Sequence, residues 1–303
     1  MLDNEKLKEM KEFYDSSEKY IDILDYKSNP YRFQVAKSYV SLLSSESVLS
    51  NKFLDLGCGT GFTSKLLSDE NLNVVGLDIS EHFIKSKKYY ESDKLNYIVG
   101  DLTLLPFQNG SFDIVGSNDV IEHILDVDKA LKEMIRVVKP NGKIIIVSPN
   151  LLSPIRPLLA LLKKEDIHLY DNSRLKAALA IFRNIYYIIS KQLSSKVNFI
   201  DRQPRLENFR GPDDDAVYWS CYIDLAFWFK KNGYKVKRAS FNPRSNSYIN
   251  KIRDMLLNII PFIDKGICIV VTKDNKSNLK ICQKSENFWS MSLLMGNHSV
   301  TRL

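Results

Sequence analysis

A short apolar segment that runs directly into a glycine-rich turn limits the fold of this chain more than any other feature. Residues 53–61 read FLDLGCGTG, with glycine at every second position from 57 to 61. The apolar residues before the turn predict a buried strand, and an amphipathic helix is expected at residues 62–68. Glycines at alternate positions permit a tight turn and let a ligand approach the bare backbone. The segment therefore predicts a strand, a ligand-binding loop and a helix in succession.

The same alternation of strands and helices continues along the chain. Branched apolar runs predict strands at 52–56, 73–77, 95–99, 112–116, 143–147, 234–241 and 266–272, and amphipathic stretches predict helices at 4–24, 33–43, 62–68, 80–90, 127–138 and 220–231. Strands and helices that alternate at this spacing are typical of a parallel sheet covered by helices on both faces. The predicted fold class is therefore a doubly wound α/β sheet.

The interruption of this pattern defines the expected domain organisation. Proline-punctuated, partly helical sequence between residues 151 and 212 separates the fifth predicted strand from the last two. We therefore expect an N-terminal helical cap at 1–50, a ligand-binding core at 51–150, an insertion at 151–212 that covers the substrate, the remainder of the core at 213–275 and a loosely held tail at 276–303.

Three acidic residues follow three consecutive predicted strands or lie at their ends. Asp55 precedes the first glycine, Asp78 ends the second strand and Asp101 follows the third. Asp55 suits a ligand that carries an ammonium group, Asp78 could accept both hydroxyls of a ribose, and Asp101 could accept from an exocyclic adenine amine. Each could instead have a local role, as a helix cap or a turn residue. All three together favour a ligand site at the carboxyl edge of the sheet.

Five motifs follow one another along the chain, namely LDLGCGTG, VVGLDIS, GDLTLLPF, FDIVGSNDVIEHI and RVVKPNGKIIIVSPN. Together they resemble the motifs of the class I S-adenosylmethionine (SAM) dependent methyltransferases, in the type 11 branch. The close match covers about residues 50–150. It implies a seven-stranded sheet, mostly parallel with a reversed last strand, and SAM as the cofactor. The residues that it implies for cofactor binding are Asp55, Leu56, Gly57, Cys58, Gly59, Gly61, Asp78, Ile79, Asp101, Leu102, Asn118 and Asp119.

His123 is the candidate catalytic residue, and three interpretations of it stay open. An imidazole titrates near neutral pH, so His123 could act as the general base that receives a proton from the methyl acceptor. Asp119, Glu122 and His123 would share one face of a helix and could hold a divalent metal, an arrangement similar to that of ubiquinone-pathway O-methyltransferases. His123 could also pack structurally and fix the loop. The prediction is a site without a metal.

An acidic and aromatic run at residues 213–219, DDDAVYW, is the candidate substrate site. Asp213 and Asp214 could bind a sugar hydroxyl or an amine, and Tyr218 and Trp219 could provide stacking surfaces. The alternative is that the carboxylates cap the following helix. The run also resembles methyltransferases found among surface-polysaccharide biosynthesis enzymes.

Charge is distributed unevenly over the chain. Its net charge is +7, but residues 1–150 hold 18 basic and 23 acidic side chains, whereas residues 151–303 hold 25 and 13. The basic second half favours an anionic partner, which is a phosphorylated small molecule, a lipid headgroup surface or nucleic acid. Apolar stretches between 151 and 190 suggest a peripheral membrane contact, although packing against the core explains them as well. Lysine-rich surface decoration would also produce the excess.

We therefore predict methyl transfer from SAM to an oxygen or nitrogen atom of a small-molecule acceptor, for example a sugar or a lipid-linked glycan intermediate. An RNA methyltransferase and a non-catalytic partner subunit are the alternatives. The first lacks a supporting motif, and the intact glycine loop argues against the second. The N-terminus has no apolar signal segment, and the four cysteines have no CxxC spacing. Both observations predict a cytoplasmic protein without a disulfide framework.

Overall fold

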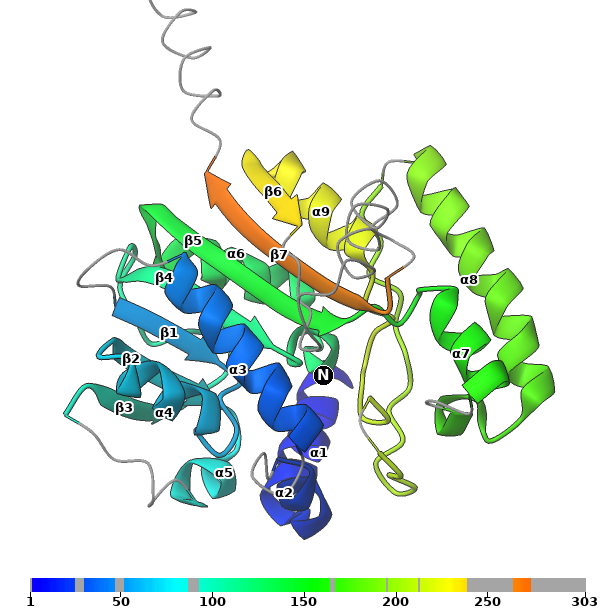
Figure 1. The fold of residues 1–303 in the computed structure, drawn as a ribbon, viewed down its shortest axis with the longest axis horizontal. Helices are drawn as coiled ribbons and strands as arrows, with labels where there is room; N and C mark the ends of the chain where they lie inside the picture. The colour runs from blue at the N-terminus through cyan, green and yellow to red at the C-terminus, as the bar shows by residue number, and fades with distance from the viewer. Residues whose placement is uncertain are drawn as a thin grey trace, which may run out of the picture.

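The protein folds around one seven-stranded sheet, shown in Figure 1 as a computed structural model that describes residues 2–24, 30–46, 52–86, 93–163, 167–194, 196–211, 213–238 and 264–273. Its strands are β1 (Lys52–Leu56), β2 (Asn73–Asp78), β3 (Leu95–Val99), β4 (Phe112–Asn118), β5 (Val138–Pro149), β6 (Tyr234–Arg238) and β7 (Gly266–Lys273). They lie in the order β3-β2-β1-β4-β5-β7-β6. The predicted strands are therefore all present.

Strand directions follow the expected pattern. β2 and β4 flank β1 and pair with it in parallel, and β3 and β5 extend the sheet in parallel on either side. β7 enters antiparallel to both β5 and β6. The seven-stranded sheet with a reversed last strand is thus confirmed. The order in which strands are added to the sheet reverses between β1 and β4, since β2 and β3 lie on one side of β1 and β4 and β5 on the other. Open α/β sheets bind ligands at such a reversal.

Helices cover both faces of the sheet. Their bounds are α1 (Leu2–Ser16), α2 (Glu18–Leu24), α3 (Pro30–Ser45), α4 (Phe62–Asp69), α5 (Glu81–Ser86), α6 (Val127–Val137), α7 (Ile155–Lys163), α8 (Arg174–Ser194) and α9 (Tyr222–Lys231), with short 3-10 turns η1 (Ile121–His123) and η2 (Ile167–Tyr170). Tyr39 of α3 and Leu67 of α4 pack on one face of the sheet. Leu131 of α6 and Phe229 of α9 pack on the other, and in Figure 1 α3 lies in front of the sheet and α6 behind it.

Two elements differ from the sequence-based expectation. The predicted helix at 4–24 is divided into α1 and α2, because the Ser17 hydroxyl accepts a hydrogen bond from the Tyr20 amide (3.2 Å) and begins a second helix. The fifth strand begins at Val138 rather than at Lys143, since residues 139–142 form a bulge. The pairing of β4 with β5 shifts at this point: Phe112 lies opposite Val138, and Ile114 lies opposite Lys143.

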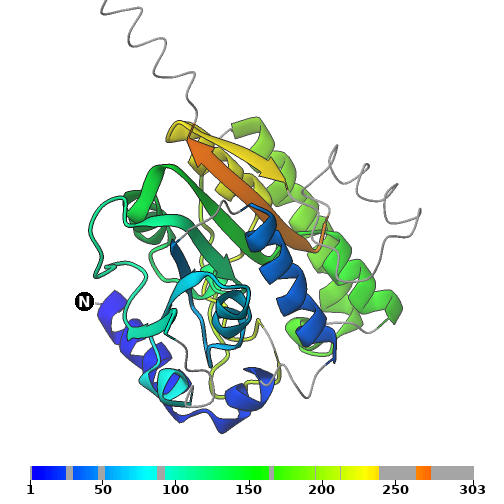
Figure 2. The same cartoon turned by 60° about the vertical axis from the view of Figure 1, so that its left-hand side comes forward.

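The segment after β5 forms a helical layer of its own. α7 and α8 pack against each other through Ala160, Ala177 and Ala180, which are all buried. Figures 1 and 2 both show this pair beside the sheet, beyond the layers that cover its two faces. The end of the strand predicted at 234–241 and the tail predicted at 276–303 lie outside the described residues. None of the described helices is long and apolar enough to cross a bilayer.

Candidate active site

The glycine loop after β1 has the backbone conformation that its sequence predicts. Gly57, Gly59 and Gly61 all have positive φ angles, of 67°, 54° and 83°. A Cβ atom at Gly57 would lie 2.2 Å from Val120, and one at Gly61 would lie 2.2 Å from the Tyr97 hydroxyl oxygen. Larger residues at these two positions would therefore push the loop away from the sheet edge.

Asp78 at the end of β2 is the carboxylate that this loop surrounds. It is buried, and its two oxygens accept hydrogen bonds from the amides of Gly59 (2.8 Å) and Ser80 (2.9 Å). Burial raises the pKa of Asp78 to about 6, although the backbone donors act in the opposite direction. Each oxygen keeps a second lone pair, so the carboxylate can still accept a ligand hydroxyl.

Asp55 has a different environment from the one its position suggested. The carboxylate is buried, and it accepts from the hydroxyls of Thr63 (2.9 Å) and Ser64 (2.6 Å) on α4. Burial raises its pKa, while these two hydroxyls lower it. Asp55 therefore joins β1 to the helix after the loop and fixes the loop between them. Its contact with an ammonium group stays a prediction.

The remaining predicted cofactor residues lie around the same edge. Asp101 accepts from the amide and the hydroxyl of Thr103, both at 2.8 Å, in a turn after β3, and Leu102 beside it is buried. At the end of β4, the Asn118 Oδ1 atom is buried and has no hydrogen-bond partner among the residues that the structure describes. A buried amide oxygen without a partner is costly, and a bound ligand would satisfy it.

The positions of the other predicted cofactor residues say less about a ligand. Leu56 is fully buried within the core, and Ile79 packs partly buried against the N-terminal helices. Burial raises the pKa of the Cys58 thiol well above its usual range, which keeps it uncharged and disfavours a nucleophilic role. Asp119 is exposed, with a φ of 53°.

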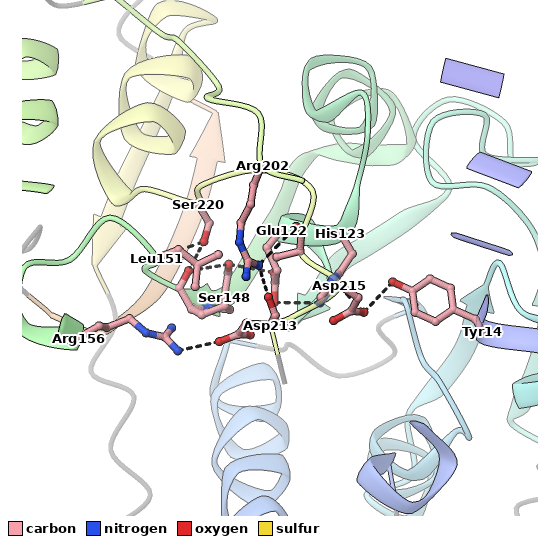
Figure 3. A network of polar contacts seen from close by, with 12 residues as sticks. Tyr14, Glu122, His123, Ser148, Leu151, Arg156, Arg202, Asp213, Asp215 and Ser220 are labelled. Carbon is pink, nitrogen blue, oxygen red and sulfur yellow. Dashed lines mark hydrogen bonds and ion pairs between the residues drawn. The ribbon is translucent and has the colours of Figure 1, made fainter. Parts of the chain in front are cut away.

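His123 lies between two carboxylates rather than in an open pocket (Figure 3). Its Nδ1 atom is 3.3 Å from Asp215 and its Nε2 atom is 3.4 Å from Glu122. The imidazole is 11% exposed, whereas both carboxylates are fully buried. Ser148 donates to Glu122 (3.0 Å), and Tyr14 of α1 donates to Asp215 (2.9 Å). The network therefore joins η1 to the N-terminal helix, to β5 and to the acidic run.

These neighbours decide the protonation state of His123. Burial opposes the charged form, but the carboxylates of Asp215 and Glu122 outweigh it and raise the pKa of His123 to about 10. The imidazole is therefore an imidazolium at neutral pH. A group that already holds its proton is a poor general base, so the geometry disfavours that expectation and favours a positioning role.

The metal alternative finds no support either. η1 is a single 3-10 turn, so Asp119 does not share a helix face with Glu122 and His123. Within the described ranges, no three His, Cys, Asp or Glu side chains are arranged to hold a metal ion.

The acidic run is a buried turn rather than a helix cap. Asp213 pairs with Arg156 (2.7 Å), and Asp214 accepts from the Arg210 amide (2.9 Å). The helix that follows begins only at Tyr222 and has Cys221 as its N-cap, so the capping alternative is wrong. Asp213 is engaged by Arg156, whereas the Oδ1 atom of Asp214 is buried and has no hydrogen-bond partner among the described residues. Contact of either carboxylate with a substrate stays a prediction.

The two aromatic residues of the run separate in the structure. Tyr218 is buried in the core and packs edge-on against Phe199. Trp219 instead has two guanidinium groups over its ring, that of Arg183 at 4.2 Å and that of Arg202 at 5.3 Å from the ring centre. A cavity of about 580 Å³ adjoins Trp219, and Lys176 and Arg205 also line it. Of the two predicted stacking residues, only Trp219 can face a ligand there.

The sequence did not identify Tyr14, Arg156 or Arg202 as site residues. Arg202 is buried and donates to the backbone carbonyls of Asp213 and Ala216, which connects the cavity to the acidic run. Tyr14 reaches Asp215 across 201 residues of sequence. These residues are identified only by their contacts in the folded structure, because none of them lies in a local sequence motif.

Comparison with known proteins finds methyltransferases among the relatives of part of this chain. A family model described as "Methyltransferase domain" matches residues 54–146. A demethylmenaquinone methyltransferase from Renibacterium salmoninarum is 39% identical over 100 residues, 33% of this chain and 42% of the relative. A ubiquinone biosynthesis O-methyltransferase from Pelagibacter ubique is 29% identical over 147 residues, 46% of this chain and 60% of the relative. The chain thus spans less than two thirds of the length of these relatives.

A solved structure extends the similarity of fold beyond this segment. The methyltransferase of Haloferax volcanii, solved in complex with the Trm112 methyltransferase activator, aligns with a TM-score of 0.50 at 16% identity over 84% of this chain and 96% of that chain. This alignment concerns the fold alone. Residues 54–146 are thus the part of the chain that is similar to methyltransferase domains.

Proposed function

We propose that this protein transfers a methyl group from SAM to an oxygen or nitrogen atom of a small-molecule acceptor. The observation that carries the proposal is the placement of Asp78, the glycine loop and the Asn118 oxygen at the strand reversal of a methyltransferase domain. A buried carboxylate with spare lone pairs and a buried amide oxygen without a partner are both acceptors, and a ribose and an amino group offer the matching donors.

The residues at this edge fit SAM, and each has a proposed part in holding it. Asp78 would accept the ribose hydroxyls, and the backbone of residues 57–61 would lie along the ribose and methionine. Asp101 and Leu102 would contact the adenine, and Asn118 would accept from the amino group. When bound, SAM supplies an activated methyl group on a sulfonium. The protein then has to align donor and acceptor and exclude water.

A proton must leave the acceptor when the methyl group arrives, and His123 is not suited to receive it at neutral pH. We assign His123 a positioning role, in which its imidazolium holds Glu122 and Asp215 in place. The Oδ1 atom of Asp215 is buried and lacks a hydrogen-bond partner within the described part of the chain. Asp215 is therefore our candidate for the group that receives the proton.

The cavity beside Trp219 supports an acceptor that carries an anionic group. Arg183 and Arg202 place two guanidinium groups against one indole ring, and a phosphate could bridge them. A phosphorylated sugar or a lipid-linked glycan intermediate would match this chemistry. The relatives named above are a demethylmenaquinone methyltransferase and a ubiquinone biosynthesis O-methyltransferase. The quinones in these two names are small molecules too.

Calorimetric titration with S-adenosylhomocysteine tests the cofactor site. We expect binding in the micromolar range by the wild type, loss of at least about tenfold in affinity in Asp78→Ala because an interaction with a buried carboxylate disappears, and no change in Asp69→Ala. Asp69 is the matched control, since its carboxylate lies on the exposed side of α4.

Turnover of phosphorylated acceptors, measured by methyl transfer from labelled SAM, tests the second half of the proposal. Asp215→Asn should then lower kcat while the affinity for S-adenosylhomocysteine is kept. A folded wild type that does not bind S-adenosylhomocysteine would overturn the proposed function.

A further inference from the structure

The largest exposed apolar surface of the described residues lies on α7 and α8. Nine of the eleven large hydrophobic side chains that are exposed belong to these two helices. Six of the seven on α8, all but Ile185, recur at alternating spacings of four and three residues, which places them on one side of the helix. We define this apolar face by its α8 members, which are Leu175, Leu179, Phe182, Tyr186, Ile189 and Leu193.

Specific polar contacts hold α8 with this face outward. On the buried side, the Asn184 side chain donates to the carbonyls of Leu151 (3.4 Å) and Ser153 (3.2 Å). Lys191 forms a buried ion pair with Asp224 of α9 (2.6 Å). The side of α8 that faces the protein therefore combines these polar residues with the buried Ala177, Ala180 and Ile188, while its other large apolar side chains face solvent. A rotation that hid the apolar face would leave Lys191 and Asp224 as unpaired buried charges.

Cationic side chains predominate around the apolar face. Neither α7 nor α8 contains an Asp or Glu residue, whereas Lys163, Arg174 and Lys176 are exposed on them. Lys176 pairs with Asp171 at the surface, and the Trp219 cavity with its guanidinium groups also borders the face at Leu179. Such a face attracts an anionic surface, and the long cationic side chains can reach the headgroups while apolar residues enter below them.

The charges also distinguish between the two obvious occupants of this face. Alternating four-three spacing would suit pairing with a second copy of the helix, but such pairs rely on opposite charges along their flanks. A parallel pair of α8 helices would bring Arg174 and Lys176 against their own copies, and α8 offers no acidic side chain to pair with them in either orientation. An anionic lipid surface has the complementary charge.

We propose that α7 and α8 dock this protein on an anionic membrane surface, with α8 in the plane of the interface. An amphipathic helix with an apolar face and a cationic border binds a bilayer in this way without crossing it. The inference does not depend on the proposed function, because it requires neither cofactor nor acceptor.

Vesicle co-sedimentation of the full chain tests the inference, with vesicles of phosphatidylglycerol and phosphatidylcholine against vesicles of phosphatidylcholine alone. The wild type should bind the anionic vesicles and be released by high salt. Phe182→Glu should weaken binding by at least about tenfold, because a charge replaces an exposed aromatic ring that would enter the bilayer interface. Leu104→Glu is the matched control, since Leu104 and Phe182 are both 72% exposed and Leu104 lies outside α7 and α8; its binding should stay unchanged.

Reversing one charge at the border of the apolar face separates the electrostatic contribution to vesicle binding from the apolar contribution. Arg174→Glu should weaken binding to anionic vesicles by roughly fivefold or more, and the far-ultraviolet circular dichroism of every variant should match that of the wild type. Absence of wild-type binding to anionic vesicles would overturn the proposal, as would equal binding by wild type and Phe182→Glu. A wild-type dimer in sedimentation velocity that Phe182→Glu converts to a monomer would instead identify the face as a subunit interface.

Discussion

The two sides of this molecule are built by different means. The cofactor edge is assembled from strand ends and the loops directly after them, and its key contact joins Gly59 to Asp78 across 19 residues. The acidic turn at 213–218 is instead held by side chains from the N-terminal helix, η1 and the segment after β5. A local backbone motif can thus build the cofactor site, whereas the proposed acceptor side requires several distant segments to pack correctly.

The largest expected effect on stability comes from removing His123 on the proposed acceptor side. His123→Ala leaves Glu122 and Asp215 buried without their cation, and we expect it to lower the free energy of unfolding by about 3–5 kcal/mol. The folded pKa of about 10 exceeds the ordinary value of 6.5, so the stabilisation is fully present below pH 6.5 and is lost as the pH rises through 10. Wild-type stability should fall over this window.

Urea denaturation at pH 6 and pH 10 checks this prediction. The decline attributed to His123 should be absent in His123→Ala, while His82→Ala, a change at an exposed histidine on α5, should behave like the wild type. Equal stability of His123→Ala and wild type at pH 6 would show that the two carboxylates do not need the imidazolium.

A smaller effect of opposite sign is expected at the cofactor edge. The pKa of Asp78 is raised to about 6 from 3.8, so its negative charge costs stability above pH 6. Asp78→Asn should therefore stabilise the ligand-free protein at pH 8 by about 1–2 kcal/mol, since the neutral side chain avoids the cost of a buried charge but gives up one backbone hydrogen bond. Affinity for S-adenosylhomocysteine should fall at the same time.

Thermal unfolding with and without S-adenosylhomocysteine measures both properties. Asp69→Asn is the control and should change neither. A destabilised Asp78→Asn would mean that Asp78 is primarily structural, and the contrast between the two sides would then disappear.

The smallest effect concerns the N-terminal helix. Tyr14→Phe removes one buried hydrogen bond to Asp215, and we expect a loss of about 1 kcal/mol in unfolding free energy. Tyr186→Phe removes an exposed hydroxyl and should have no measurable effect. Chemical denaturation compares the two variants directly, and an unchanged Tyr14→Phe would show that α1 packs on the acidic turn through its apolar side chains alone.

The same contrast explains what the sequence could predict. The sheet, its order of elements and the loop at 57–61 follow from periodic apolar patterns and glycine positions, which are local properties. The protonation of His123 depends on Asp215, which lies 92 residues further along the chain, and no local pattern reports that contact. Trp219 was identified from composition, but its two stacked guanidinium groups come from Arg183 on α8 and Arg202 on a separate segment.

The hydrogen bond between Tyr14 and Asp215 also bears on the order in which the molecule can assemble. It joins α1 to a turn that lies 201 residues further along the chain. The loop and strands of the cofactor edge can form early, because their contacts close short stretches of chain. Helix α1 can make this contact only after the residues between the two partners have been synthesised. The proposed acceptor side is therefore completed after the strands and the loop of the proposed cofactor edge.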